Sequence, residues 1–295
     1  MSRTLFNFPD ADIVLRSAHD TSKGNALFEP IDFSVHRCVL SAASQFFEGL
    51  FSLPQPPSKP TGRLPVIPFT ETEAVLDTLL RYIYPVPKPV IRSLEELAPA
   101  LEAAHKYDVQ AATDGLRKHL IAPELLRKHP LRVYAIASRY NLEEEARIAS
   151  TATLAAGLLA QPLHEDLKAM TAFAYHRLAV LHERRASEAI KLLVLPDEVR
   201  CRLCSGAQYV RWAAAPARGG ATPISGKPPK WWAPYQERAR EELRTRPASG
   251  VVVSMQFLQE AAREAGCEQC GTSILASFWW FEQLREKIDA LPATV

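Results

Sequence analysis

The stretch that decides the fold begins with Asp12-Ile-Val-Leu-Arg16 and continues with Phe33-Ser-Val-His36-Arg-Cys-Val-Leu40-Ser-Ala-Ala-Ser44-Gln-Phe46-Phe47-Glu-Gly-Leu50-Phe51. Three consecutive apolar residues bounded by polar ones predict a buried strand over 12–16. Alternating apolar and polar residues over 31–35 predict a second, half-buried strand, joined to the first by a long loop. From His36 onward the apolar spacing becomes helical, and Ser44 is placed to cap the second of two short helices.

The same mixture of short strands and helices continues to residue 122. A proline-interrupted apolar run over 64–69 predicts a short strand at a sheet edge, because proline cannot donate a ladder hydrogen bond. Thr70 and Glu73 have the spacing of a capping box, and so do Ser93 and Glu96, so helices are expected to begin at both points. A further short helix completes this part, which we predict to be α+β.

Beyond Pro123 the apolar spacing is helical. We predict helices over 133–140, 142–154, 163–181, 251–262 and 274–291. The helix over 163–181 is expected to be long, with an unbroken apolar stripe that faces the core. Residues 205–230 are rich in glycine and proline and predict a loop, and Gly266 is placed to close the helix before it.

Six segments of residues 8–122 resemble, in order and spacing, the BTB/POZ domain, a protein-interaction fold. They are Asp12-Ile-Val-Leu15, Phe33-Ser-Val-His36, Val39-Leu40-Ser41, Ser44-Gln-Phe46-Phe47, Leu79-Leu80-Arg-Tyr82-Ile83-Tyr84 and Ala103-Ala104-His-Lys-Tyr107. A narrower resemblance, to the fungal, basidiomycete-type BTB proteins, is carried by Phe51-Ser-Leu-Pro-Gln-Pro56, Leu64-Pro-Val-Ile-Pro68 and Pro130-Leu-Arg-Val-Tyr-Ala-Ile-Ala137.

The resemblance implies a BTB/POZ fold, a small mixed sheet with helices, over residues 8–122. Helices over 123–195 resemble the BACK-like extension that follows such domains, and 196–295 is expected to be a small helical module with paired cysteines. In the family, the residues matching Asp12 and His36 tend to be buried and hydrogen-bonded inside the domain. Neither is therefore assigned to catalysis.

The family also implies a class of partner. BTB domains commonly self-associate, and many bring substrates to cullin-RING ubiquitin ligases, so we expect a non-enzymatic adaptor or scaffold that binds other proteins, with a homo-oligomer and a cullin among the candidates. Cullin-binding members carry a hydrophobic-X-Glu element just after the helix that here ends near Phe51. This chain has Ser52-Leu-Pro-Gln-Pro-Pro-Ser58 there, without a glutamate.

Two CxxC pairs stand in the C-terminal third: Cys201-Arg-Leu-Cys204 and Cys267-Glu-Gln-Cys270. Two-residue spacing lets both thiolates of a pair reach one ion, and four sulfurs close a tetrahedral sphere, so Cys201, Cys204, Cys267 and Cys270 are candidate ligands of a structural zinc ion. The separation between the pairs is long for a zinc ribbon. Two other interpretations stay open: independent small hydrophobic residues, or a redox pair, although no thioredoxin-like βαβ pattern surrounds either pair.

The same third is basic. Residues 200–246 hold ten lysines or arginines against three acidic residues, interleaved with Trp212, Trp231, Trp232 and Tyr235. Positive charge with aromatic rings can bind nucleic acid, which gives a second hypothesis, a transcription-linked factor. The alternatives are a solvated surface and tryptophans that seal the C-terminal helices.

Composition limits the remaining classes. The chain has 295 residues, of which 47% are hydrophobic and 23% are charged, with a formal net charge of +2, which is ordinary for a globular protein and names no partner. No signal peptide and no apolar run of about 20 residues is found, so we expect no membrane association and a cytoplasmic or nuclear protein. The motifs GxGxxG, GxxxxGK[ST], GxSxG and HExxH are absent, which argues against an enzyme.

Overall fold

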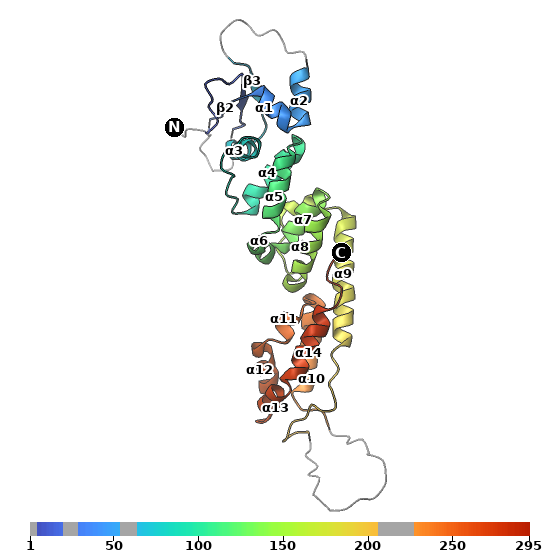
Figure 1. Ribbon diagram of the computed structural model, residues 1–295. Coiled ribbons are helices and arrows are strands. Elements are labelled where there is room, and N and C mark those ends of the chain that lie inside the picture. The colour runs from blue at the N-terminus through green and yellow to red at the C-terminus, as the bar shows by residue number, and fades with distance from the viewer. Residues whose placement is uncertain (1–4, 20–28, 54–63, 206–226) are drawn as a thin grey trace, which may run out of the picture. The chain divides into compact units, whose positions relative to one another are not determined.

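The computed structural model describes residues 5–19, 29–53, 64–205 and 227–295. Its contacts divide the chain into two compact units, Met1–His129 and Pro130–Val295. Figure 1 labels their elements in chain order. The second unit holds both the helices after residue 129 and the cysteine pairs, so the expected boundaries at 122/123 and 195/196 stay predictions.

The first unit contains a three-stranded mixed sheet in the order β2-β1-β3. Its strands are β1 (Ile13–Arg16), β2 (Asp32–Val35) and β3 (Val66–Pro68). The central strand β1 runs antiparallel to β2, with Ile13 opposite Val35, and parallel to β3, with Val14 opposite Val66. The predicted hairpin and the predicted edge strand are both confirmed.

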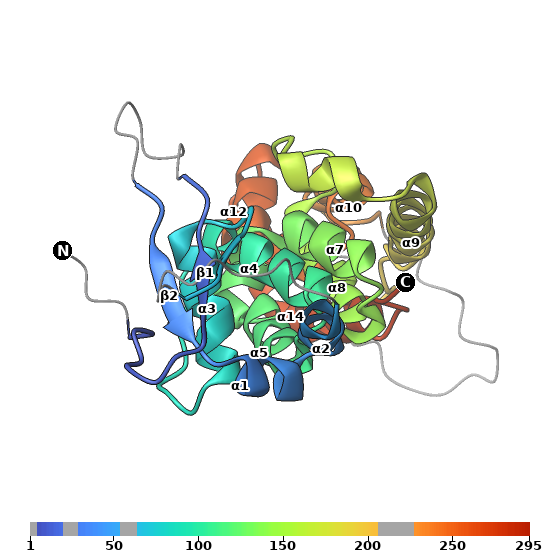
Figure 2. The same cartoon turned by 90° about the horizontal axis from the view of Figure 1, so that it is seen from above.

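Helices fill the rest of the first unit. They are α1 (Arg37–Ala43), α2 (Gln45–Ser52), α3 (Glu73–Ile83), α4 (Leu94–Lys106), α5 (Gln110–Leu120) and α6 (Pro123–Lys128). Figures 1 and 2 show α3 next to the strands. Phe33, Leu40 and Phe47 are all fully buried, so the strand and helix faces that the sequence pattern predicts to be apolar form the core.

Ser44 links two parts of this core. Its hydroxyl accepts a hydrogen bond from the Phe47 amide at 3.1 Å, which caps α2 as predicted, and donates to the Tyr107 carbonyl oxygen at 2.6 Å. The predicted capping box at Thr70 and Glu73 is wrong. The helix α3 follows Thr72, which makes no side-chain cap, while the Thr70 hydroxyl donates to the Glu71 carboxylate.

The second expected capping box is half formed. The Ser93 hydroxyl accepts a hydrogen bond from the Glu96 amide at 3.4 Å, so α4 begins where the sequence predicts. The Glu96 carboxylate, however, accepts from the Arg92 amide rather than from that of Ser93. The two polar residues singled out by the family resemblance both bond within this unit. The Asp12 carboxylate accepts from the Arg37 amide at 2.8 Å, and the His36 amide donates to the Tyr84 hydroxyl at 2.9 Å.

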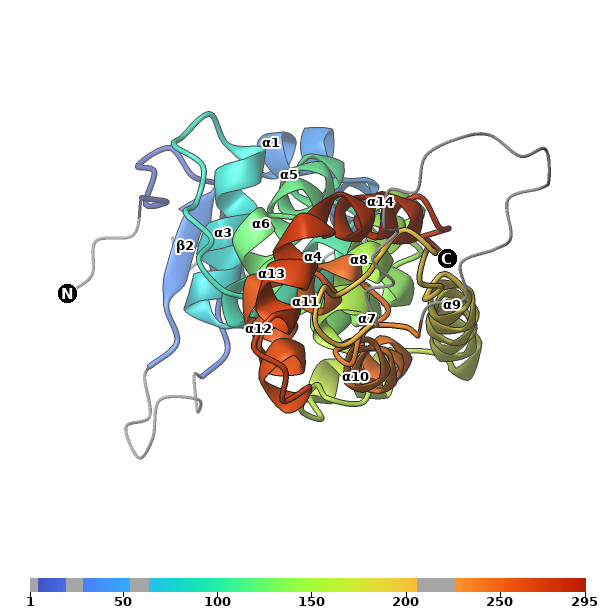
Figure 3. The ribbon, with the colours of Figure 1, turned by 90° about the horizontal axis from the view of Figure 1, so that it is seen from below.

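The described part of the second unit is helical. Its elements are α7 (Pro130–Arg139), α8 (Glu143–Ala156), the 3-10 helix η1 (Glu165–Ala169), α9 (Ala172–Lys191), α10 (Trp232–Thr245), α11 (Ser249–Val252), α12 (Met255–Glu264), α13 (Cys270–Ala276) and α14 (Phe278–Asp289). Figure 3 shows α10, α12, α13 and α14 gathered in one group. Among the described residues, no helix combines the length and the apolar character needed to cross a membrane.

Three helix predictions in this unit need correction. The single helix expected over 163–181 is η1 followed by α9, because the Thr171 hydroxyl accepts from the Ala174 amide and starts a new helix there. Leu163, counted as part of the apolar stripe, is 91% exposed. The helix expected over 251–262 is α11 and α12, separated at the cap Ser254, and that over 274–291 is α13 and α14.

The end of α12 follows the sequence prediction. Gly266 has a φ of 58°, a left-handed conformation that lets the chain turn away from the helix without the strain that a Cβ atom would cause. The predicted loop over 205–230 lies mostly outside the described residues.

An aromatic core holds the C-terminal helices together. Trp231, Tyr235 and Phe281 are fully buried, and the Trp231 ring lies 5.7 Å from that of Phe281. The thiols of Cys201 and Cys270 belong to the same buried cluster. The two cysteine pairs are therefore positioned by the packing of this core.

Candidate functional sites

The first CxxC pair lies in a tight turn. The Cys201 amide donates to the Ser205 hydroxyl at 2.9 Å, and the Ser205 amide donates back to the Cys201 carbonyl oxygen at 3.1 Å. These reciprocal bonds fold the turn onto itself and bring the two thiols of the pair to one side. The second pair follows Gly266, and its last member, Cys270, begins α13.

The structure brings all four predicted ligands together. The sulfur atoms of Cys201, Cys204, Cys267 and Cys270 lie within 4.8 Å of one another. The Cys201–Cys267 and Cys204–Cys270 sulfur distances are both 3.8 Å, far beyond the roughly 2.05 Å of a disulfide. A tetrahedral ion about 2.3 Å from each sulfur would set the sulfurs about 3.8 Å apart. The cluster therefore has the geometry to hold one metal ion.

Backbone amides point at these sulfurs. The sulfur of Cys201 accepts hydrogen bonds from the amides of Leu203 and Cys204 inside its own turn. The sulfur of Cys204 accepts from the Lys230 amide at 3.3 Å. Such N–H groups stabilise thiolates, because their dipoles face the negative charge.

A second sulfur contact comes from the same distant segment. The Trp231 amide donates to the sulfur of Cys270. Its indole Nε1 donates to the Ser273 hydroxyl at 3.1 Å, and that hydroxyl donates to the Arg200 carbonyl oxygen at 2.9 Å. The start of α10 is thus bonded to both halves of the cysteine cluster.

The thiols do not share one electrostatic environment. Burial raises the pKa of Cys204 and of Cys270, and the hydrogen bonds that lower these pKa values do not outweigh it. Burial also raises the pKa of Cys201, but amide and thiol hydrogen bonds outweigh it, so that this pKa falls below its usual value. Four neighbouring thiolates repel one another, and a cation at their centre would let all four ionise.

Sequence spacing found the four cysteines but missed their supporting residues. The contacts described above are made by Ser205, Lys230, Trp231 and Ser273. The spacing of these residues in the sequence does not predict that they surround the cysteines. Ser205 directly follows the first pair, which is the only sequence signal for any of them. The sulfur contacts of Lys230 and Trp231 come from backbone amides, which every residue except proline has.

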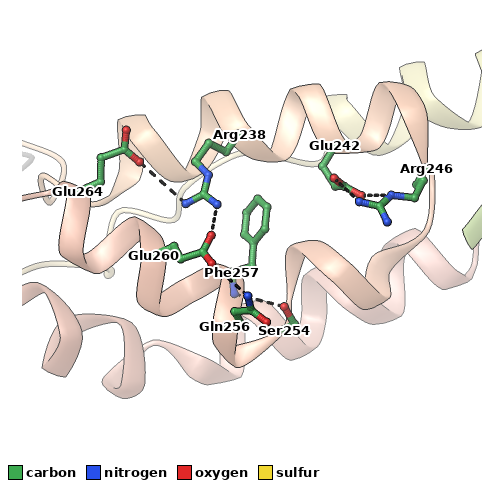
Figure 4. Close-up of polar contacts among 8 residues, drawn as sticks. All are labelled: Arg238, Glu242, Arg246, Ser254, Gln256, Phe257, Glu260 and Glu264. Atoms are coloured by element: carbon green, nitrogen blue, oxygen red, sulfur yellow. Dashed lines mark hydrogen bonds and ion pairs between the residues drawn. The ribbon is translucent and has the colours of Figure 1, made fainter. Parts of the chain in front are cut away.

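Two arginines of the basic stretch are engaged in ion pairs within the C-terminal helices. The guanidinium of Arg238 bonds the Glu260 carboxylate and lies 4.9 Å from the Phe257 ring centre, as Figure 4 shows. The same figure shows Arg246 paired with Glu242.

Two of the described aromatic rings of this stretch are not available for stacking. Trp231 and Tyr235 are fully buried, and Trp232 is partly buried against the same core. Trp212 lies outside the described residues. Stacking on nucleic-acid bases needs exposed ring faces, which the buried Trp231 and Tyr235 do not offer.

Comparison with known proteins identifies the first unit. Residues 27–124 match the family model of the BTB/POZ domain. The chain contains a BTB/POZ domain. No curated protein matches the chain. The BTB/POZ domain accounts for the mixed sheet and for α1 to α5, and as a class such domains are protein-interaction modules.

Several large apolar side chains of the BTB/POZ domain remain exposed. Leu53, directly after α2, is 60% exposed, and Val66 on β3 is 43% exposed. Among the described strands, β3 pairs only with β1 and so leaves one edge open, although Pro68 on it lacks an N–H group. Exposed apolar residues and an open strand edge are candidates for contact with another polypeptide.

Proposed function

We propose that this protein is a non-enzymatic adaptor or scaffold that binds other proteins through its BTB/POZ domain. The observation that carries the proposal is the match of residues 27–124 to that domain, together with the mixed sheet and helices of the first unit. Apolar side chains at Leu53 and Val66 supply surface whose burial would stabilise a complex, at about 25 cal/mol per Å² of apolar area. The narrower kinship with fungal, basidiomycete-type BTB proteins is part of this proposal and is supported by three sequence motifs.

Self-association is the first form of binding to test. Size-exclusion chromatography with light scattering on the full chain, over a wide range of concentration, should show a mass that rises above 32.8 kDa. The variant Leu53→Asp should shift that curve toward the monomer, because a charge would then have to be buried in the interface. Val90→Asp is the matched control, since Val90 is also exposed, at 75%, but lies between α3 and α4 rather than directly after α2. A constant monomer mass, with no protein recovered by affinity purification, would count against the adaptor function.

A cullin is the second candidate partner. The family supplies the expectation, while the segment after Leu53 lacks the glutamate typical of cullin-binding members. Affinity purification of the full chain followed by mass spectrometry, compared with residues 1–122, tests this point. Recovery of a cullin would place the protein in a ubiquitin ligase, and its absence would leave other partners or self-association as the adaptor's targets.

Nucleic-acid binding is the alternative, and it has less support. The rings of Trp231 and Tyr235 are buried, and Arg238 and Arg246 are paired with carboxylates. A DNA-binding factor would be retained on a duplex DNA column at low salt and released as salt rises. Failure of the full chain to bind such a column would remove this alternative.

A further inference from the structure

The cysteine cluster lies in the second unit, outside the residues that match the BTB/POZ domain. We propose that Cys201, Cys204, Cys267 and Cys270 hold one structural zinc ion, and that this ion fixes a third segment, Lys230–Trp231, in the C-terminal core. The proposal rests on four sulfurs within 4.8 Å of one another and on the amides that bond to them.

The spacing of the sulfurs selects a single ion. Two of their separations are 3.8 Å, which matches the edge of a tetrahedron with metal–sulfur bonds of about 2.3 Å. A cluster of several iron atoms would need a wider cage than this one. Tetrahedral all-sulfur sites take zinc or iron, and the usual order of stability places Zn²⁺ above Fe²⁺ at the same ligands.

The ligand set makes the ion structural. Four cysteines fill a tetrahedral sphere and leave no position for water or substrate. Cys201 and Cys270 are 1% and 0% exposed, so half of the ligand set is shielded from solvent. Each thiol that is protonated loses its proton to solvent as its bond to zinc forms, and the thiolates then carry more negative charge than the ion neutralises.

The sulfur-bonded amides compensate this charge. Leu203, Cys204, Lys230 and Trp231 each direct an N–H group at a cluster sulfur. A hydrogen bond from an N–H group to a thiolate is stronger than one to a neutral thiol, because the thiolate is charged. Metal binding should therefore tighten the contact between the cluster and the Lys230–Trp231 segment.

Trp231 carries this effect into the core. Its ring is fully buried, lies 5.9 Å from that of Tyr235, and bonds Ser273 through Nε1. A metal that secures the Trp231 backbone thus also secures the first turn of α10 against α13. Loss of the ion should loosen this aromatic core and expose its rings.

The first experiment measures the metal and the thiols of the full chain purified without chelator. We expect about one zinc per chain. Alkylation followed by intact mass analysis should modify only Cys38, the exposed cysteine in α1, and should modify all five cysteines after the zinc is removed. Cys204→Ser and Cys267→Ser should lose the zinc, whereas the control Cys38→Ser should keep it.

The second experiment needs no variant. Removing zinc from the wild-type chain should shift tryptophan emission to longer wavelength, and adding Zn²⁺, but not Mg²⁺, should reverse the shift. Replacing zinc with Co²⁺ should produce the absorption bands of tetrahedral cobalt–thiolate coordination. The proposal is overturned by zinc near zero with all five thiols reactive, by stoichiometric iron, or by zinc retained in both Cys204→Ser and Cys267→Ser. Unchanged tryptophan emission in the zinc-free chain would refute the coupling to Trp231.

Discussion

Arg185 on α9 offers the sharpest test of how the second unit is held together. It is 6% exposed, and its guanidinium donates to the carbonyl oxygens of Pro247 and Ile288 at 2.8 and 2.7 Å, both buried. Two further bonds, to the carbonyl oxygens of Leu291 and Pro292, are partly buried. Burial lowers the pKa of Arg185 and the Asp289 carboxylate partly restores it, but an arginine stays protonated at any ordinary pH.

The loss on substitution follows from these bonds. A hydrogen bond to a charged group contributes about 1.5–3 kcal/mol, and the partly buried carbonyls can bond water instead. Counting only the two buried bonds, Arg185→Met should lower the free energy of unfolding of the second unit by about 3–6 kcal/mol. Arg184→Met is the matched control, because Arg184 is exposed on the same helix, and it should stay within about 0.5 kcal/mol of wild type.

Urea unfolding followed by tryptophan fluorescence suits this measurement. All five tryptophans lie in the second unit, so their emission reports on it without a contribution from tryptophans in the BTB/POZ domain. A loss below about 1 kcal/mol, or equal losses in Arg185→Met and Arg184→Met, would show that the buried carbonyls do not depend on this cation.

Two further predictions concern stability. Gly115→Ala should destabilise the BTB/POZ domain by about 1–3 kcal/mol, because the new Cβ would lie 2.2 Å from a ring carbon of buried Tyr82. The control Gly49→Ala, where the new Cβ would meet nothing within 4 Å, should be neutral or stabilise α2 by up to about 1 kcal/mol. Calorimetry of both variants measures this difference, and equal changes in the two would contradict the prediction. Burial lowers the pKa of His182 to about 4, below its unfolded value of about 6.5, so the unfolded state takes up the proton first and the second unit should lose stability as the pH falls from about 6.5 toward 4. Unfolding measured at several pH values should show this loss of stability reduced in His182→Gln and kept in the control His176→Gln, because the side chain of His176 is exposed. The same pH dependence in wild type and in both variants would contradict the prediction.

The strand pattern of the first unit could be predicted because its signals are local. Alternation over 31–35 and the apolar run over 12–16 each depend on neighbouring residues only, and both strands are found. Whether Thr70 and Glu73 form a capping box could not be predicted from neighbouring residues alone. The Thr70 hydroxyl instead bonds the Glu71 carboxylate. That carboxylate accepts hydrogen bonds from Lys106, at 2.7 Å, and from the Tyr107 hydroxyl, and these two residues lie 35 and 36 positions away in sequence.

The predicted helix over 163–181 failed for a different reason. Apolar residues continue at helical spacing through Leu163 and Met170, but spacing alone does not show whether a polar residue between them starts a new helix. Thr171 does so, and Leu163 is left in solvent. Periodicity therefore indicates which residues share a face only within one uninterrupted helix.

The candidate metal site was predictable in its ligands and not in its surroundings. Cysteine is a scarce residue with a distinctive spacing, so the four sulfurs could be found from sequence. The amides of Lys230 and Trp231 have no such signal, because their role depends on the tertiary fold, which brings them next to cysteines far away in sequence. Only the fold shows that a third segment completes the site.

The lengths of the C-terminal helices explain why this module would need a metal. The helix α11 has 4 residues and α13 has 7, and isolated helices shorter than about 12–15 residues are marginal in water. Such elements persist only where tertiary contacts hold them, and here α13 begins at Cys270 itself. The BTB/POZ domain holds none of the four clustered cysteines, and its helices α3 and α4 bury Leu79 and Leu97 in its own core. Zinc removal should therefore lower the unfolding free energy seen by tryptophan fluorescence while leaving the calorimetric transition of the BTB/POZ domain in place, and a simultaneous loss of both would show that the two units unfold as one.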